Sequence, residues 1–445
     1  MSHQDQQGNT VRPLETAIFS CLLAVCFVAS WAGGSFRASH LILLGVFVVL
    51  GGLGCGLCFS KPFPFPRPVT LAVFVVYLVM LGRDMLSWQA DRQWQAGLLT
   101  VVQSSIPMLL IMFWPLRACW SPARCLSGIV WGFAIYACAN YISYILGYRG
   151  TLRDVGEFYI TGISGNSVRW PMVFAPGINA FGVTCGVFAA IAVGQVMRAS
   201  ARHDLQALCG AGSRLLICVF GTYVVETRAV FYLLILPMLW NLGGWLKIEF
   251  RVALAACCLL VAAFGAVAYT HIMTGELSNR LERVAGHIGR DPGHFWTLSN
   301  RIYLWEYALE NIKTNGVPVY GQGIAGRDLS YGIVLATGDT GLEGITKHAH
   351  NGGLECYVTY GPLGAIVLGA VVSLVLLTAA ALSGASCAGG GEVIALAVSA
   401  VVLANVTESF FEQNTFWLFL VLGGYMIDWT WTRRPADPLK GENAV

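Results

Sequence analysis

Long apolar runs follow one another along most of this sequence, and they restrict the chain to a membrane fold. A helix needs about 20 consecutive apolar residues to cross the hydrocarbon core of a bilayer. Hydrophobic residues make up 56% of the chain and charged residues only 11%, which is roughly half the charged fraction of soluble domains. The sequence therefore predicts an all-α protein that crosses a membrane many times.

About twelve runs have a length and composition that predict transmembrane helices. In chain order they are approximately Thr16–Phe36, Leu41–Phe59, Val69–Leu86, Gly97–Leu116, Cys125–Leu146, Met172–Val196, Leu215–Thr227, Ala229–Leu246, Val252–Met273, Tyr357–Leu382, Val393–Phe411 and Phe416–Trp431. The polar N-terminus precedes the first run without a small-residue cleavage pattern, which predicts a retained cytoplasmic tail. An even number of spans places both termini on the same side.

Basic residues in alternate connections indicate the orientation of the spans. With the N-terminus inside, the inside connections carry Lys61 and Arg67, Arg117 and Arg124, Arg198, Arg202 and Arg214, Lys247 and Arg251, and in the tail Arg433, Arg434 and Lys440. Two connections depart from the rule: the inside loop SGASCAGGGE has no basic residue, and the outside stretch Tyr148–Trp170 has three arginines. This orientation predicts that the long polar segment lies outside, which in a Gram-negative cell means the periplasm.

The run from Arg214 to Leu246 is long for one helix and short for two. Glu226 and Arg228 would be costly at the depth of the bilayer core, which predicts a break between them and two short helices. Thr227 is then placed to cap the second helix, with Arg228 in its first turn. Free backbone N–H groups beside a guanidinium predict an anion site there. The alternative, one tilted helix, would place the long polar segment in the cytoplasm.

One long polar segment interrupts the apolar runs and divides the chain into three parts. We expect N-terminal transmembrane helices over residues 1–273, a large periplasmic loop with the active site over 274–356, and C-terminal helices with a cytoplasmic tail over 357–445. Most connections need only a few residues. A polar segment of this length therefore predicts a folded cap over the helical bundle.

Helical periodicity within the polar segment predicts one helix from an N-cap at Ser299 to about Thr314. Its apolar side is formed by Ile302, Trp305, Leu309 and Ile312, and we expect this side to face the membrane. Gly316 follows the helix, and Gly321 and Gly323 are expected to reverse the chain in the turn PVYGQG.

Three residues combine the chemistry of a transferase with positions at the predicted outer surface: Arg228, Arg301 and His350. Two guanidinium groups can hold a diphosphate bidentately and offset the charge that grows on it as a bond breaks. A histidine titrates near physiological pH, so it can remove a proton from an incoming sugar hydroxyl.

Other kinds of site are disfavoured by the sequence. His348 and His350 form an HxH pair without a third ligand at suitable spacing, and there is no DxD, P-loop or GxSxG motif, so no metal and no cofactor is expected. The net charge of +3 does not favour nucleic acid as a partner. Glu408 and Glu412 lie near the same predicted surface, where they either orient a site residue or are solvated, and we favour the second interpretation.

The chain resembles the polytopic O-antigen ligase and polymerase family over roughly Thr222 to Gly369. Three pieces carry the resemblance: ETRAVFYLLI, SNRIYLWEYALENIKTNGVPVYGQG and HAHNGGLECYVTYGPLGAI. In the family pattern an arginine follows the first hydrophobic break, and in this sequence that position is Arg228. The family's Ser-x-Arg motif, which opens a helix with a tryptophan, falls on Ser299, Arg301 and Trp305. Its glycine turn falls on Gly321 and Gly323, and its His-Asn pair on His350 and Asn351.

The resemblance implies a GT-C-like glycosyltransferase that inverts the anomeric carbon without a metal. Its donor is expected to be a glycan on undecaprenyl diphosphate, and its acceptor a sugar of the lipid A core at the membrane. His350 is implied as the general base, with Arg228 and Arg301 on the diphosphate. Further candidates for substrate binding are Asn351, Lys347, Arg153, Arg169, His348 and Trp305.

Three alternatives remain open at this stage. An O-antigen polymerase would use a second lipid-linked repeat as acceptor, and a protein O-oligosaccharyltransferase would use a Ser or Thr, although the short sequence after Trp431 disfavours the latter. A transporter of lipid-linked glycan would do no covalent chemistry, but internal repeats and midplane charges typical of transporters are not found. The sequence does not indicate the oligomeric state.

Overall fold

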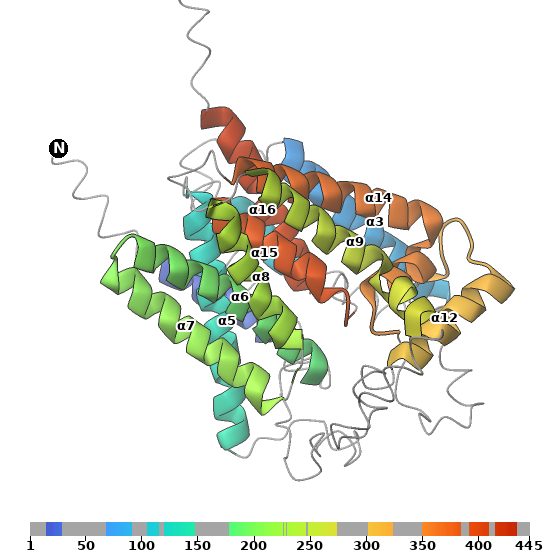
Figure 1. Ribbon diagram of the computed structural model, residues 1–445, viewed down its shortest axis with the longest axis horizontal. Coiled ribbons are helices and arrows are strands. Elements are labelled where there is room, and N and C mark those ends of the chain that lie inside the picture. Colours follow the sequence, from blue (N-terminus) through green and yellow to red (C-terminus); the bar gives the residue numbers. More distant parts are fainter. Residues whose placement is uncertain are drawn as a thin grey trace, which may run out of the picture.

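The computed structural model of the protein is a bundle of helices (Figure 1). It describes residues 15–28, 68–90, 105–114, 120–146, 178–225, 227, 229–245, 248–273, 301–323, 349–383, 391–408 and 414–433. Five described helices are long and apolar enough to cross a membrane: α5 (Pro122–Ile145), α6 (Ile178–Ala201), α7 (Leu205–Val224), α9 (Ile248–Met273) and α14 (Gly352–Leu382). The protein is therefore a helical membrane protein.

The other labelled helices are α3 (Pro68–Ala90), α8 (Ala229–Trp245), α12 (Arg301–Asn315), α15 (Gly391–Ala404) and α16 (Asn414–Arg433). Shorter apolar helices without a label cover Glu15–Val28 and Ser105–Trp114. The predicted span Leu41–Phe59 lies outside the described residues, so the count of about twelve spans stays a prediction. No strand occurs in the described ranges.

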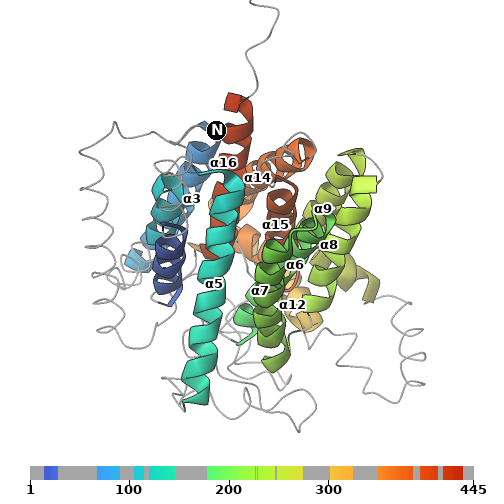
Figure 2. The same cartoon turned by 90° about the vertical axis from the view of Figure 1, so that its left-hand side faces the viewer.

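The long helices run between two ends of the bundle, so their termini gather at these two ends (Figures 1 and 2). At one end, which we call the His350 end, α3, α5, α7 and α9 terminate and α6, α8 and α14 begin. At the other, the Arg251 end, α6, α8 and α14 terminate and α9 and α15 begin. Of the described helices, α3, α5, α7 and α9 precede connections predicted to lie outside, and all four end at the His350 end.

Aromatic side chains fill the core where α5, α6 and α16 meet. The rings of Phe133 and Phe188 stack with their centroids 3.9 Å apart, and Phe419 packs on Phe188 at 5.5 Å. All three side chains are buried. Close aromatic packing of this kind adds to the stabilisation that burial gives, and it holds the three helices in fixed positions.

The predicted break near residue 227 is confirmed, because α7 ends at Val224 and α8 begins at Ala229. Between them the Thr227 N–H donates to the Thr222 carbonyl at 3.1 Å. The first of the two helices is longer than expected. Asp204 caps it by accepting a hydrogen bond from the Ala207 N–H at 3.0 Å, so α7 has 20 residues and can cross a membrane by itself.

A kink at Gly361 divides α14, and the turn after α12 docks into it. Pro362 has no N–H to donate to the Val358 carbonyl four residues earlier. The Gln322 N–H donates to that carbonyl instead, at 2.9 Å. Likewise, the Leu363 N–H donates to the Val319 carbonyl at 3.3 Å. The turn at residues 318–323 therefore supplies hydrogen bonds that the kinked helix cannot make within itself.

Positive φ angles of 72° and 74° at Gly321 and Gly323 confirm that this turn needs glycine. A Cβ atom on Gly321 would collide with the carbonyl of Thr359, whereas one on Gly316 (φ 69°) would meet nothing within 4 Å. We expect Gly316→Ala to lower the free energy of unfolding by about 1–2 kcal/mol, the cost of the left-handed conformation alone.

Gly321→Ala is expected to cost about 3–5 kcal/mol, because steric overlap with α14 is added to the same backbone cost. Thermal unfolding of the two purified variants in detergent compares them directly. Equal losses of stability in the two variants would contradict the close docking of the turn against α14.

Candidate functional site

His350 lies directly before α14, in a backbone conformation that few side chains adopt. Its φ angle is 51°. The N–H of His350 donates to the Glu355 carboxylate at 2.9 Å, and Glu355 is fully buried in the first turn of α14. Asn351 caps the helix, because its side-chain oxygen accepts from the Leu354 N–H at 3.0 Å. The Glu355 side chain therefore holds the backbone N–H of His350, and the Asn351 side chain holds the helix start that follows it.

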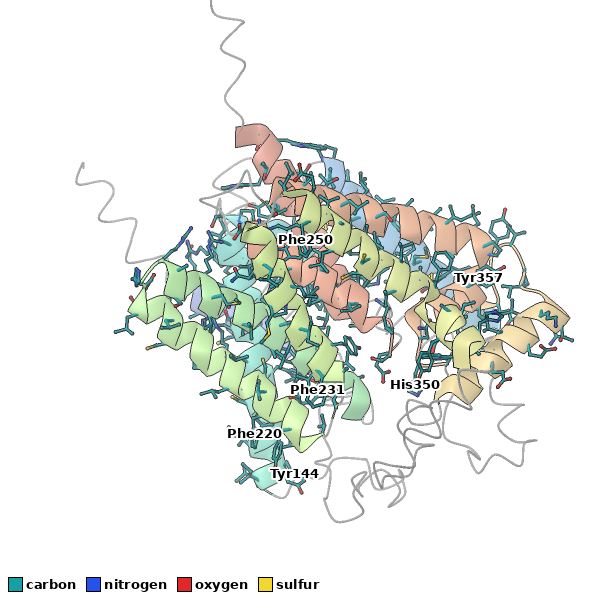
Figure 3. The ribbon with its side chains drawn as sticks, viewed as in Figure 1. Tyr144, Phe220, Phe231, Phe250, His350 and Tyr357 are labelled. Carbon is teal, nitrogen blue, oxygen red and sulfur yellow. The ribbon has the colours of Figure 1, made fainter. Side chains whose placement is uncertain are left out.

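The imidazole of His350 faces the carboxylate of Glu408. The distance from Nδ1 to Oε2 is 3.0 Å, and the side chains are 16% and 8% exposed. An ionised carboxylate can only accept a hydrogen bond, so in a pair with ionised Glu408 the shared proton is on Nδ1, and a neutral imidazole then has its lone pair on Nε2. In this arrangement a carboxylate orients the imidazole ring, as it does for histidines that act as general bases. In Figure 3, His350 lies at the same end of the bundle as Tyr144 and Phe231.

Residues 405–408, the turn after α15, form the support for this pair. The Asn351 side-chain amide donates to the Val406 carbonyl at 3.0 Å, and the Gly352 N–H donates to the Asn405 carbonyl at 2.7 Å. These bonds join the start of α14 to the residues that precede Glu408. These two hydrogen bonds hold the start of α14 against the 405–408 turn, and they thereby place His350 beside Glu408.

Helix α12 is fixed against the same place by its tryptophan. Trp305 is 1% exposed, and its indole N–H donates to the Ala349 carbonyl at 2.8 Å. Trp305, Leu309 and Ile312, three of the four residues of the predicted apolar side, pack on α9 and α14, so they face neighbouring helices where we had expected the membrane. The helix ends before Gly316, as predicted.

The side chains of the two predicted arginines both lie outside the described part of the chain. Arg301 is the first residue of α12, and its side chain lies outside the described part; Trp305, one turn later, bonds to the neighbour of His350. Arg228 lies outside the described residues. Four positions on, the Tyr232 hydroxyl is 2.6 Å from the Thr407 hydroxyl, next to Glu408.

The other predicted binding residues divide into two groups. Lys347, His348, Arg153 and Arg169 lie outside the described residues. Asn351 and Trp305 are described, and both are buried with their polar groups bonded within the fold, so the contacts seen give them structural roles. Among the described residues no group of three or more His, Cys, Asp or Glu is arranged to hold a metal ion.

Sequence reasoning missed three residues of this region. A solvated Glu408 was favoured over one that orients a site residue, but its side chain is only 8% exposed and faces His350. Glu355 was not singled out, although a glutamate in the first turn after an Asn cap is a recognisable signal. Arg83 was not a candidate from the sequence, yet its guanidinium donates to the carbonyls of Tyr320 and Gly321 at 3.2 and 3.0 Å. It therefore holds the 318–323 turn on α3.

Comparison with known proteins places this region in a family. Residues 214–369 match the O-antigen ligase family, and this segment contains α8, α9, α12, His350 and the kinked part of α14. A search of curated proteins found no match to the chain. The family consists of membrane proteins with glycosyltransferase-like activity of the ligase or polymerase type. Residues 214–369 are therefore the part of this chain that is similar to the O-antigen ligase family.

Proposed function

We propose that the protein is an O-antigen ligase that transfers a glycan from undecaprenyl diphosphate to a sugar hydroxyl of the lipid A core. The observation that carries this proposal is the His350–Glu408 pair at 3.0 Å. His350 lies inside the segment that matches the family, and Glu408 follows that segment in the chain. A sugar hydroxyl is activated when a general base removes its proton, and a histidine oriented by a carboxylate can do this. The loop of residues 274–356 is proposed to face the periplasm, as the distribution of basic residues favours.

In the proposed reaction, Nε2 of His350 takes the proton of the acceptor hydroxyl. The acceptor oxygen forms a bond to the anomeric carbon while the bond from that carbon to the diphosphate oxygen breaks. The electron pair of the broken bond leaves with the lipid diphosphate, where Arg228 and Arg301 are proposed to stabilise the added charge. Attack from the face opposite the leaving group inverts the anomeric configuration. Glu408 stabilises the imidazolium that forms on His350.

Transfer between purified components tests this function. The full-length protein in detergent receives lipid-linked glycan as donor and lipid A core as acceptor, with a chelator present. We expect glycan attached to the core, and a product of inverted anomeric configuration. If the glycan instead lengthens on the lipid carrier whether or not core is supplied, the protein is a polymerase. Failure to join glycan to either acceptor would contradict the transferase proposal.

Glu408 is a positioning residue in this proposal, and its replacement separates positioning from binding. We expect Glu408→Gln to lower kcat of transfer up to about 100-fold with little change in KM, because the ring loses its charged partner but not its substrate contacts. Glu408→Asp is expected to restore part of the activity. Glu310→Gln, at an exposed position of α12, is the matched control. A rise in KM with unchanged kcat would show that Glu408 contributes to binding instead.

A further inference from the structure

One side-chain hydrogen bond joins the first turn of α8 to the turn that carries Glu408. The Tyr232 hydroxyl lies 2.6 Å from the Thr407 hydroxyl, and both side chains are half-buried. This distance is within the usual range for a hydrogen bond between two hydroxyl groups, and either oxygen can be the donor. Thr407 is the neighbour of Glu408, whose carboxylate faces His350. The bond therefore links α8 to the support of the proposed base.

Both partners of this bond have little conformational freedom. A tyrosine has two χ angles and a rigid ring, and a threonine, which is branched at Cβ, is stiff at χ1. The turn around Thr407 is itself held, because the Val406 N–H donates to the Leu403 carbonyl at 3.0 Å. A bond between two such side chains restrains the distance between the backbone of α8 and that of residues 405–408.

The packing of α8 on α6 is of a different kind. Gly186 of α6 lies so close to α8 that a Cβ atom there would be 2.9 Å from Leu233, which is fully buried. Gly182 likewise leaves room for Thr227, in the break before α8. Apolar packing is not directional, whereas a hydrogen bond depends on the distance and angle between its atoms. We therefore expect α8 to stay folded on α6 without the tyrosine hydroxyl, but with a less fixed position relative to residues 405–408.

The position of α8 matters for the proposed reaction. Arg228, which is proposed above to stabilise the charge on the diphosphate, directly precedes Ala229, the first residue of α8. The acceptor hydroxyl and the leaving diphosphate are on opposite faces of the anomeric carbon, so the donor side and the base must be a fixed distance apart. A misplacement of about 1 Å can lower a reaction rate about 100-fold.

We propose that Tyr232 is a positioning residue for glycan transfer: through Thr407 it holds the start of α8, and thus the donor side, at a fixed distance from the proposed base. This inference rests on the function proposed above. The tyrosine takes no part in proton transfer, and its effect on the reaction passes through Thr407. In Figure 3, Phe231, the neighbour of Tyr232 in the chain, lies at the same end of the bundle as His350.

Removal of the hydroxyl from either partner tests the proposal. Tyr232→Phe and Thr407→Val keep a similar side-chain shape, and each is expected to lower kcat of transfer about tenfold with little change in KM for the lipid-linked donor. The double variant is expected to lose no more activity than either single variant, because both remove the same bond. Thr407→Ser keeps a hydroxyl and is expected to keep most of the activity. The measurement is steady-state transfer from purified donor to lipid A core by the full-length protein in detergent.

Tyr425→Phe is the matched control. The Tyr425 hydroxyl donates to the Trp120 carbonyl at 2.7 Å, so this variant also loses one tyrosine hydrogen bond. Trp120 precedes α5, whose 24 residues span about 36 Å from there to the His350 end. We expect Tyr425→Phe to transfer glycan at the rate of the natural protein, although its thermal unfolding midpoint falls at least as far as that of Tyr232→Phe, because its bond is buried.

The proposal is wrong if Tyr232→Phe transfers glycan at the natural rate or changes only KM. It is also wrong if the losses of Tyr232→Phe and Thr407→Val multiply in the double variant, or if Tyr425→Phe loses as much activity as Tyr232→Phe. In each of these cases the natural protein still transfers glycan, so the proposed function stands. If the natural protein joins glycan to neither acceptor, the proposed function fails and this inference fails with it.

Discussion

Replacement of His350 by asparagine is expected to lower kcat/KM for glycan transfer by about 10²–10⁴-fold, the usual contribution of a general base. Asparagine is chosen because it tolerates a positive φ better than most residues, and His350 has a φ of 51°. The N–H that donates to Glu355 is also retained. The variant therefore removes the imidazole with little change to the backbone. Transfer between purified donor and core acceptor measures the loss.

His203→Asn is the matched control for this experiment. His203 also has a positive φ, 54°, but it is exposed in the turn between α6 and α7, far from the His350 end. We expect His203→Asn to transfer glycan at the rate of the natural protein, with the same thermal unfolding profile as His350→Asn. Full activity of a folded His350→Asn variant would exclude His350 as the base.

Replacement of either arginine by alanine is expected to lower the rate of transfer by about 10²–10³-fold, the loss measured when one donor to a developing charge is removed. Arg228→Lys and Arg301→Lys are expected to recover only part of the activity, because lysine keeps the charge but not the bidentate geometry. The measurement is single-turnover transfer from radiolabelled lipid-linked glycan, which follows the chemical step.

An experiment in cells tests Arg301 in a second way. In cells without another ligase, Arg301→Ala is expected to abolish long-chain lipopolysaccharide while lipid-linked polymer persists. Lys313→Gln changes an exposed charge at the far end of α12 and is expected to support normal attachment. If glycan is trapped on the cytoplasmic leaflet in the arginine variant, the protein is a transporter and the proposed chemistry is wrong.

Local physical rules account for the parts of the fold that could be predicted. The cost of charge at bilayer depth predicted the break between Glu226 and Arg228, and helical spacing predicted α12 with Trp305 on its packed side. The glycine turn was predicted from Gly321 and Gly323 because only glycine adopts such angles readily. Each of these features depends on residues that are close together in the sequence.

The contacts that could not be predicted join distant parts of the chain. Glu408 lies 58 positions after His350, and Arg83 lies 237 positions before Tyr320. Periodicity shows which side of a helix is apolar, but not which helix ends meet at one end of a bundle. A polar residue at such an end therefore has the same sequence pattern whether it faces water or a partner. For that reason Glu408 was interpreted as solvated.

The kink of α14 has a consequence for how the protein is assembled. In lipid, a carbonyl without a donor costs several kcal/mol, and Pro362 leaves the Val358 carbonyl without its donor in the helix. Gln322 supplies the missing N–H, so α14 reaches its final shape only when residues 318–323 have docked. Biogenesis of the last part of the chain thus depends on completion of the preceding segment. Substitutions in that turn are then expected to trigger quality-control proteolysis of the whole polypeptide, even where no reacting group is altered.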